Sequence, residues 1–275
     1  MNGEGAYLSA VVPFGYSEFT GEGLLPLYQE MGCRSVQVQR HPEADPPASE
    51  LRSKTENAGL RIDSLHGRFG SHLDPSSPHR AVRDLTRQVA MEDAEYVVAL
   101  GGAFVVLHPS AGGTVTGSLE RQKRLIDFLG DLEDSARDLG VRFLLENLPP
   151  SYPLGGHAGD LLDVLQEVQS EWFGLILDTG HANMADDPGQ QITLMMSGGI
   201  SAMHVHDNRG SLDNHQWPGE GSLDWSKIAA HTPDLPEIPL AVEVFPSESE
   251  LAKRVQTGGG AGVRKLLGLS GSSVG

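Results

Sequence analysis

The sequence has 275 residues, of which 39% are hydrophobic and 21% are charged, a composition typical of a globular protein with a substantial core. Its 37 acidic and 20 basic residues give a formal net charge of −17, which disfavours DNA or RNA as a partner because nucleic acids are bound largely through Lys and Arg. No apolar run approaches the length of about 18 residues that a membrane-spanning helix needs.

The first residues and the cysteine content indicate the compartment. Residues 1–14 lack the basic region and the apolar stretch of a signal peptide. The single cysteine, Cys33, allows no internal disulfide, which agrees with a reducing environment. We therefore expect a cytoplasmic protein that does not bind membranes, and at Cys33 a small buried thiol rather than a nucleophile.

The chain repeats one unit, in which an amphipathic segment ends at a glycine and a short apolar segment follows. Glycine just beyond a helix adopts the left-handed conformation at little cost, so it commonly ends the helix. The pattern predicts helices, each followed by a glycine, over Leu24–Met31, Leu51–Ala58, His79–Leu100 and Leu125–Leu139. Asp224 is expected to cap a later helix, and Val263–Leu269 to belong to the last one.

Eight short segments are apolar rather than alternating, as strands are when both faces of a parallel sheet are covered. They are Leu8–Val12, Ser35–Gln39, Leu60–Leu65, Phe104–Leu107, Val141–Leu145, Phe173–Leu177, Ile200–Val205 and Leu240–Val244. Eight strands alternating with helices predict an α/β fold, the (β/α)8 TIM barrel, in one domain over residues 1–275 with frayed residues 270–275. A doubly wound open sheet is the alternative, but no Gly-x-Gly-x-x-Gly follows the first strand.

The stretch richest in potential metal ligands is Met203–Trp225, MHVHDNRGSLDNHQWPGEGSLDW. It places His204, His206, Asp213 and His215 within a dozen residues. Imidazole and carboxylate groups are ordinary ligands of zinc, manganese and iron. A polar surface loop can have the same composition, so the metal hypothesis requires that other strands contribute ligands as well.

Other predicted strands do end in ligand-type residues. Such residues lie at or just beyond the ends of six strands, namely His66, His108, Glu146, Asp178 with His181, His204, and Glu243. The carboxyl ends of barrel strands face one shared cup, so these side chains are expected to converge there. A carboxylate after several apolar residues costs stability unless a partner satisfies it, which favours a metal site at this end.

The pieces LHP, LLEN, LDTGHAN and MHVHDN, with DNHxxPGEGSLDW after them, resemble the xylose-isomerase-like TIM barrels. This superfamily contains sugar and sugar-phosphate isomerases and epimerases together with AP endonucleases of family 2. The resemblance extends from the first strand to the last. It implies one divalent metal ion with four ligands, Glu146, Asp178, His204 and Glu243.

The resemblance also implies catalytic roles. Glu146 and Glu243 would be acid/base groups as well as ligands, and His181 would contact substrate or metal. The endonuclease branch of the superfamily uses a larger, three-metal set, which would add His66, His108, His181, Asp213 and His215. These five residues are therefore candidates for additional metal ligands or for residues that support the first site.

Four further residues are candidate substrate contacts. Arg209 could bind a phosphate or carboxylate, with a salt bridge at the rim as the alternative. Trp217 could stack on a sugar ring or simply cover the loop. Asn147 could orient a ligand or cap a turn, and His206 could support His204 or turn outward.

We therefore expect an isomerase or epimerase acting on a small sugar, sugar phosphate or polyol, with proton transfer next to a metal-polarised carbonyl. The mixed imidazole and carboxylate set fits Mn, Zn, Fe or Co better than Mg. One alternative is a phosphoesterase of the AP-endonuclease type with two or three metal ions. Another is a metal-dependent lyase or dehydratase. A homo-oligomer is compatible with the sequence.

Overall fold

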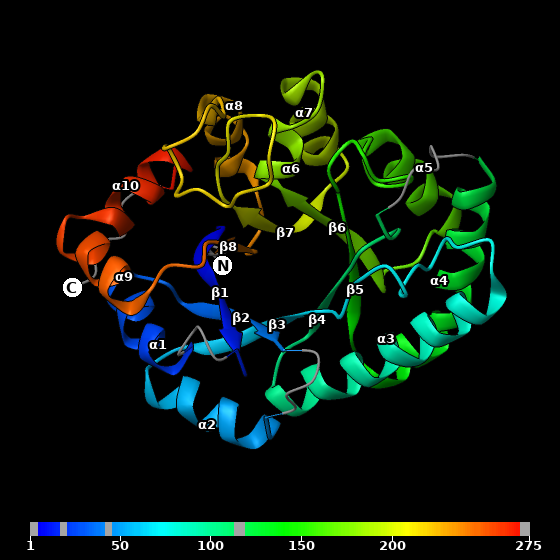
Figure 1. Cartoon of the computed structure of the whole chain (residues 1–275), viewed down its shortest axis with the longest axis horizontal. Coiled ribbons are helices and arrows are strands. Elements are labelled where there is room, and N and C mark those ends of the chain that lie inside the picture. Colours follow the sequence, from blue (N-terminus) through cyan, green and yellow to red (C-terminus); the bar gives the residue numbers. More distant parts are fainter. Residues whose placement is uncertain (1–4, 17–20, 42–45, 113–118, 270–275) are drawn as a thin grey trace.

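The computed structural model describes residues 5–16, 21–41, 46–112 and 119–269; the predicted frayed end at 270–275 lies outside these ranges. Eight parallel strands pair in sequence order, and the first also pairs with the last, which closes a barrel. Helices surround the barrel (Figure 1). The predicted (β/α)8 TIM barrel is therefore confirmed, and the open sheet is excluded.

All eight predicted strands form, with ends that differ from the prediction by up to two residues. They are β1 (Tyr7–Phe14), β2 (Ser35–Arg40), β3 (Arg61–His66), β4 (Phe104–Leu107), β5 (Arg142–Glu146), β6 (Phe173–Asp178), β7 (Ile200–Val205) and β8 (Pro239–Val242). Pairs of neighbouring strands stay parallel throughout. The carboxyl ends of the strands therefore share one face of the barrel, as the site prediction requires.

The described helices lie between successive strands, except for the last two, which follow the last strand. They are α1 (Gly21–Glu30), α2 (Ala48–Asn57), α3 (Arg80–Leu100), α4 (Leu119–Leu139), α5 (Ala158–Val168), α6 (Thr179–Asn183), α7 (Pro188–Ser197), α8 (Trp225–Ala229), the 3-10 turn η1 (Thr232–Asp234), α9 (Glu248–Gln256) and α10 (Gly259–Leu266). Gly101 ends α3 in the left-handed conformation. Asp224 caps α8 by accepting a hydrogen bond from the backbone N–H of Ser226, as predicted.

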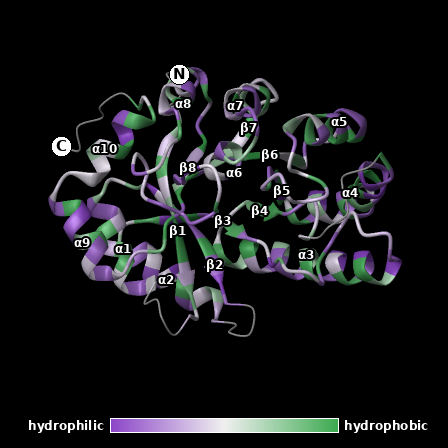
Figure 2. Cartoon of the chain, turned by 45° about the horizontal axis from the view of Figure 1, so that its top comes forward, coloured by the Kyte–Doolittle hydropathy of each residue, from purple (hydrophilic) through white to green (hydrophobic). Residues whose placement is uncertain are grey.

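The core has two parts, one between barrel and helices and one inside the barrel. The inner part is a small layer of Val106, Leu144, Ile176 and Ala202 on four adjacent strands. The outward side chains of all eight strands pack with the helices in one large cluster. Figure 2 shows mainly hydrophobic strands and helices striped with hydrophilic residues. None of the helices that the structure describes has the length and apolarity needed to cross a membrane.

Two strands contain an extra residue that changes which side chains face inward. In β7 the pairing with β6 skips Ser201, so Ile200 packs outward while Ala202 lies inside the barrel. In a regular strand these two residues would lie on the same face. In β3 the pairing with β2 skips Asp63 in the same way. Such bulges re-aim the side chains that follow them. In β7 the bulge turns Ala202 and His204 toward the inside of the barrel, and in β3 it does the same for Ser64.

Cys33 lies buried between α1 and β2, and burial raises the pKa of its thiol above the ordinary value. A thiol with a raised pKa is a poor nucleophile. The expected small buried thiol is therefore confirmed.

Candidate metal centre

Four predicted ligands meet at the carboxyl end of the barrel. The Nδ1 atom of His204, on β7, lies 3.0 Å from Glu146 Oε1, 3.1 Å from Glu243 Oε2 and 3.7 Å from Asp178 Oδ2. Glu146 and Asp178 end β5 and β6, and Glu243 follows β8 directly. One oxygen or nitrogen from each residue lies within 4.8 Å of the others. The predicted convergence of these four side chains is confirmed.

The charged groups of this cluster shift one another's pKa values. Burial alone would raise the pKa of Glu146, but the imidazoles of His204 and His108 hold it well below its ordinary value. For His204 burial opposes the charged form, yet Glu243 and Glu146 raise its pKa well above the ordinary value. Within this cluster three buried carboxylates face one protonated imidazole, so negative charge exceeds positive charge and the site favours a further cation.

A second cluster adjoins the first through Glu146. The Nε2 atoms of His108 and His66 lie 3.1 and 3.8 Å from Glu146 Oε2. His66 Nδ1 donates a hydrogen bond to the backbone oxygen of Gly67 at 2.9 Å, because a carbonyl can only accept. That bond leaves its Nε2 as the free ring nitrogen facing Glu146. The ring centroids of Phe69 and His108 lie 4.7 Å apart, and the Phe69 side chain is half exposed.

A third cluster is centred on Asp213. Its Oδ2 atom lies 3.0 Å from His181 Nε2 and 3.5 Å from His215 Nε2. The other ring nitrogens donate to backbone carbonyls, His181 Nδ1 to Asn147 at 2.8 Å and His215 Nδ1 to Glu243 at 2.9 Å. The backbone carbonyls of Asn147, next to Glu146, and of Glu243 therefore fix both rings with Nε2 toward Asp213. All nine residues of the larger predicted set lie in three adjoining clusters.

The third cluster is also charged. Burial opposes protonation of both rings, but Asp178 and Asp213 raise the pKa of His181 to about 10. The hydrogen bond with Asp213 and the charge of Glu243 raise the pKa of His215 to about 9. Burial would raise the pKa of Asp213, but both imidazoles lower it. In the metal-free protein, protons on these rings supply the cationic charge.

His206 and Asn147 hold Asp178 in place. His206 is fully buried, and its Nε2 lies 3.0 Å from both carboxylate oxygens of Asp178, so the alternative that it turns outward is wrong. Its ring stacks on that of His215, with centroids 4.0 Å apart. The Asn147 side-chain amide bonds the backbone N–H and carbonyl of Asp178 at 2.7 and 2.9 Å. This arrangement favours an orienting role for both, and their substrate contacts stay a prediction.

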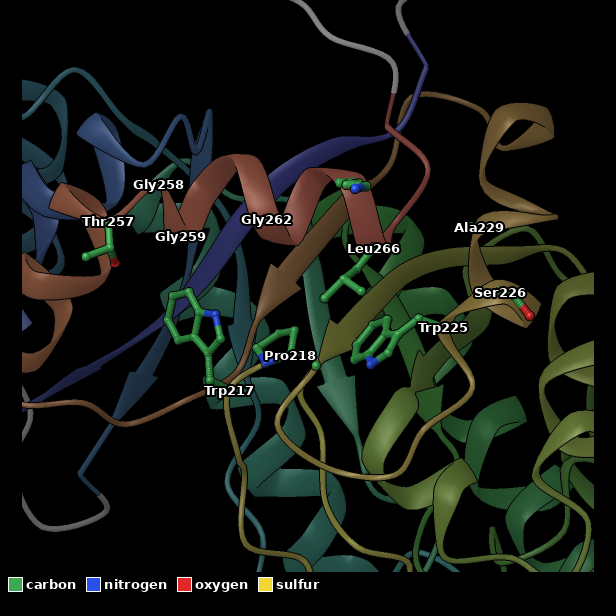
Figure 3. Close-up of a pocket in the computed structure, with 12 residues that line it drawn as sticks. Trp217, Pro218, Trp225, Ser226, Ala229, Thr257, Gly258, Gly259, Gly262 and Leu266 are labelled. Carbon is green, nitrogen blue, oxygen red and sulfur yellow. The ribbon is translucent and has the colours of Figure 1, made fainter.

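Neither Arg209 nor Trp217 forms a hydrogen bond or ion pair with the four ligands among the described residues. Arg209 is exposed after β7 and forms no ion pair with the residues that the structure describes. The Trp217 ring lies under the guanidinium of Arg254, 4.9 Å from its centre. Figure 3 shows Trp217, Pro218 and Trp225 next to one another along α10. This packing fits the loop-covering alternative for Trp217, and sugar stacking stays a prediction.

Sequence reasoning missed two residues near the site. Gln37 on β2 is buried, and its Oε1 lies 2.8 Å from His204 Nε2. A glutamine inside the apolar strand SVQVQR was the available signal, because a buried amide needs partners. Tyr152, between β5 and α5, is half-buried, and burial together with the charges of Asp213 and Glu146 raises its pKa.

The sequence matches a known family with the same fold. A family model described as a xylose isomerase-like TIM barrel matches residues 25–258. The chain belongs to this family. Among curated proteins, the uncharacterized protein MJ1311 of Methanocaldococcus jannaschii is 30% identical over 169 residues. The match covers 60% of this xylose isomerase-like chain and 57% of MJ1311, so the chain spans little more than half of that relative's length.

Solved structures of this fold include sugar epimerases. The D-psicose 3-epimerase of Clostridium cellulolyticum, solved with D-tagatose, is 18% identical with a TM-score of 0.75, covering 96% of this chain and 99% of that one. A Thermus thermophilus protein, TTHB071, whose crystals were soaked with ZnCl2, is 26% identical with a TM-score of 0.68, covering 94% and 99%. The likeness to the epimerase at this identity establishes the shared fold alone.

Proposed function

We propose that this xylose isomerase-like barrel is a divalent-metal-dependent isomerase or epimerase acting on a small sugar, sugar phosphate or polyol. The observation that carries the proposal is the convergence of Glu146, Asp178, His204 and Glu243 at the carboxyl end of the barrel. The likeness of the fold to a D-psicose 3-epimerase supports the same class of reaction.

The four side chains fit a divalent cation. They supply three carboxylates and one imidazole from a buried position. Glu146 Oε2 is buried and lies 3.1 Å from His108 Nε2, but it accepts no hydrogen bond of regular geometry from the described residues. A buried carboxylate oxygen of this kind costs stability unless a cation or a donor satisfies it. The mixed nitrogen and oxygen set favours Mn, Zn, Fe or Co over Mg.

The protein's own groups would move the proton. A bound divalent ion supplies Lewis acidity at the substrate carbonyl. Glu146 and Glu243 enter the cup from β5 and from the end of β8, both within reach of His204 Nδ1. One carboxylate would take the proton from the carbon next to the carbonyl, and the other would return it. His181 is oriented by Asn147 and is the third catalytic candidate.

Solvent exchange tests the proposal. The protein, loaded with Mn2+ or Co2+, is incubated in D2O with ketoses, aldoses and their phosphates, and products are followed by NMR. We expect deuterium at a carbon next to the carbonyl of one sugar, together with its epimer or isomer. A dehydrated product would indicate the lyase reaction instead. If fully loaded protein exchanges no proton of any sugar, the proposal is refuted.

The second and third clusters favour one other function. They place His66, His108, His181, Asp213 and His215 beside the four-ligand set, as a phosphoesterase with two or three ions would require. Ions held by these residues would lower the pKa of water and so supply the nucleophile for phosphoester hydrolysis. The net charge of −17 argues against a DNA substrate. Hydrolysis of bis(p-nitrophenyl) phosphate by metal-loaded protein, without sugar exchange, would establish this second function.

A further inference from the structure

A line of hydrogen bonds runs inside the barrel and ends on His204. Gln37 Oε1 lies 2.8 Å from His204 Nε2, and Gln37 Nε2 lies 3.0 Å from Ser64 Oγ. Ser64 Oγ in turn lies 2.5 Å from Asp63 Oδ1. All four side chains are more than nine-tenths buried. The line therefore joins β7, β2 and β3 away from bulk water.

The line has one direction. Asp63 accepts hydroxyl bonds from Ser64 on one oxygen and from Ser9 and Ser35 on the other. Burial raises the pKa of Asp63, and these three hydroxyls counter that effect. Because Ser64 gives its only proton to Asp63, its oxygen must accept from the Gln37 amide N–H. The amide oxygen then faces His204, so His204 Nε2 must carry a proton.

The direction sets the state of His204. Whether the ring is neutral or protonated, Nε2 is a donor to Gln37. In the neutral ring Nδ1 is then the atom with a free lone pair, and Nδ1 is the atom that faces Glu146 and Glu243. Hydrogen bonds of this type on the far nitrogen orient a metal-binding histidine and raise its basicity.

The bulge in β3 makes this contact possible. Gln37 pairs with Ser64 only because the register with β2 skips Asp63. In a regular strand Ile62 and Ser64 would share a face, whereas Ile62 packs outward against the helices. The extra residue therefore brings both the hydroxyl and the terminal carboxyl of the line into the barrel.

We propose that Gln37 is a positioning residue, which holds His204 with its proton on Nε2 and its Nδ1 directed at the three carboxylates. Gln37 touches neither a metal ion nor a substrate and acts only through His204. The inference rests on the proposed metal centre for its consequence, which is tighter metal binding. The hydrogen bonds themselves do not depend on that function.

Three variants test the proposal. Gln37→Met keeps the length of the side chain but removes the acceptor, and Gln37→Glu restores an acceptor for the Nε2 proton. Gln39→Met is the matched control, because Gln39 lies on the same strand and face two residues further along. The first measurement is the Nε2–H resonance of His204 in metal-free protein and its exchange with water. The second is the Kd of Co2+ and Zn2+ by competition with a chromophoric chelator.

We expect a slowly exchanging Nε2–H resonance in the wild type, the control and Gln37→Glu, and its loss in Gln37→Met. The metal Kd should rise about 10- to 100-fold in Gln37→Met. Gln37→Glu should recover most of the affinity, and the control should retain it. An unchanged resonance and an unchanged Kd in Gln37→Met would overturn the proposal. Wild-type protein that shows the resonance but binds no metal would refute the proposed function and leave the orientation of His204 established.

Discussion

The imidazole of His206 lies directly on Gly180. A Cβ atom at position 180 would stand 2.0 Å from His206 Cε1 and 2.7 Å from Nε2, which no packing tolerates. The absence of a side chain at Gly180 lets His206 reach both carboxylate oxygens of Asp178. The glycine of LDTGHAN and the second histidine of MHVHDN are therefore one structural unit.

Gly180→Ala should damage this unit. We expect a loss of about 1–3 kcal/mol in the free energy of unfolding, because His206 must leave a packed position, and weaker metal binding because Asp178 loses its partner. Gly130→Ala is the control, since Gly130 is exposed within α4 with open space at its Cβ, and it should stabilise the protein by up to about 1 kcal/mol. Denaturant unfolding of both variants measures the free energy of unfolding, and metal titration measures the metal affinity. Equal stability of the two would contradict the argument.

His108→Ala and Asp213→Ala distinguish one metal ion from several. In a four-ligand site neither residue is a ligand, so mass spectrometry should still find close to one ion per chain while turnover falls. In a multinuclear site each substitution removes a ligand and exposes neighbouring cations to their mutual repulsion. We expect the single essential ion. A wild-type count above one that decreases in either variant would favour the phosphoesterase.

Glu243→Gln should weaken metal binding and abolish turnover under either mechanism. The amide keeps the shape of the side chain, but it cannot accept a proton or supply negative charge to the cation. His204 Nδ1 would lose a charged partner now 3.1 Å away. Metal affinity and sugar exchange in D2O are the readouts. A fully active variant would overturn the assignment of the site.

The metal-free protein should lose stability as the pH rises from about 6.5 to about 10. His181 and His215 have folded-state pKa values of about 10 and about 9, above the unfolded value of about 6.5. Their contribution is therefore complete below the unfolded pKa and is lost as the pH passes through the folded values. We expect a decrease of about 1–3 kcal/mol in denaturant titrations with chelator present. A flat profile would contradict the charged state of the third cluster.

The protein should not bind duplex DNA tightly at physiological salt. Its 20 basic residues are outnumbered by 37 acidic ones, so few cations can displace counterions from the phosphate backbone. Fluorescence anisotropy with an abasic duplex, in the presence of Mn2+ or Zn2+, measures the affinity. Submicromolar binding followed by incision would reverse the order of the two proposed functions.

The pattern of strands and helices predicted the fold, and strand-end position predicted that the ligand-type residues converge, because parallel strands of a barrel must end on one face. The choice of four ligands among them came from the family resemblance. His206 shows where the reasoning was applied incompletely. Alternation along the strand places it on the same face as His204, whereas the outward alternative rested only on His204 taking the ligand position. Gln37 differs, since the strand SVQVQR indicates a buried amide that needs a partner, but the partner, His204, is 167 residues away and cannot be found from the local sequence. The bulges at Asp63 and Ser201 are likewise set by pairing between strands rather than by local sequence.

The extra residue in β7 affects any attempt to rebuild this cup elsewhere. Ile200 belongs to the outer packing and His204 to the inner cup, yet an unbroken strand would put them on one face. Grafting only the ligand residues onto an idealised eight-stranded barrel would therefore force a choice between a buried His204 and a packed Ile200. A transplanted centre must bring Ser201 with it as a spacer. Among the described residues, Ser201 forms no hydrogen bond with the four candidate metal-binding residues.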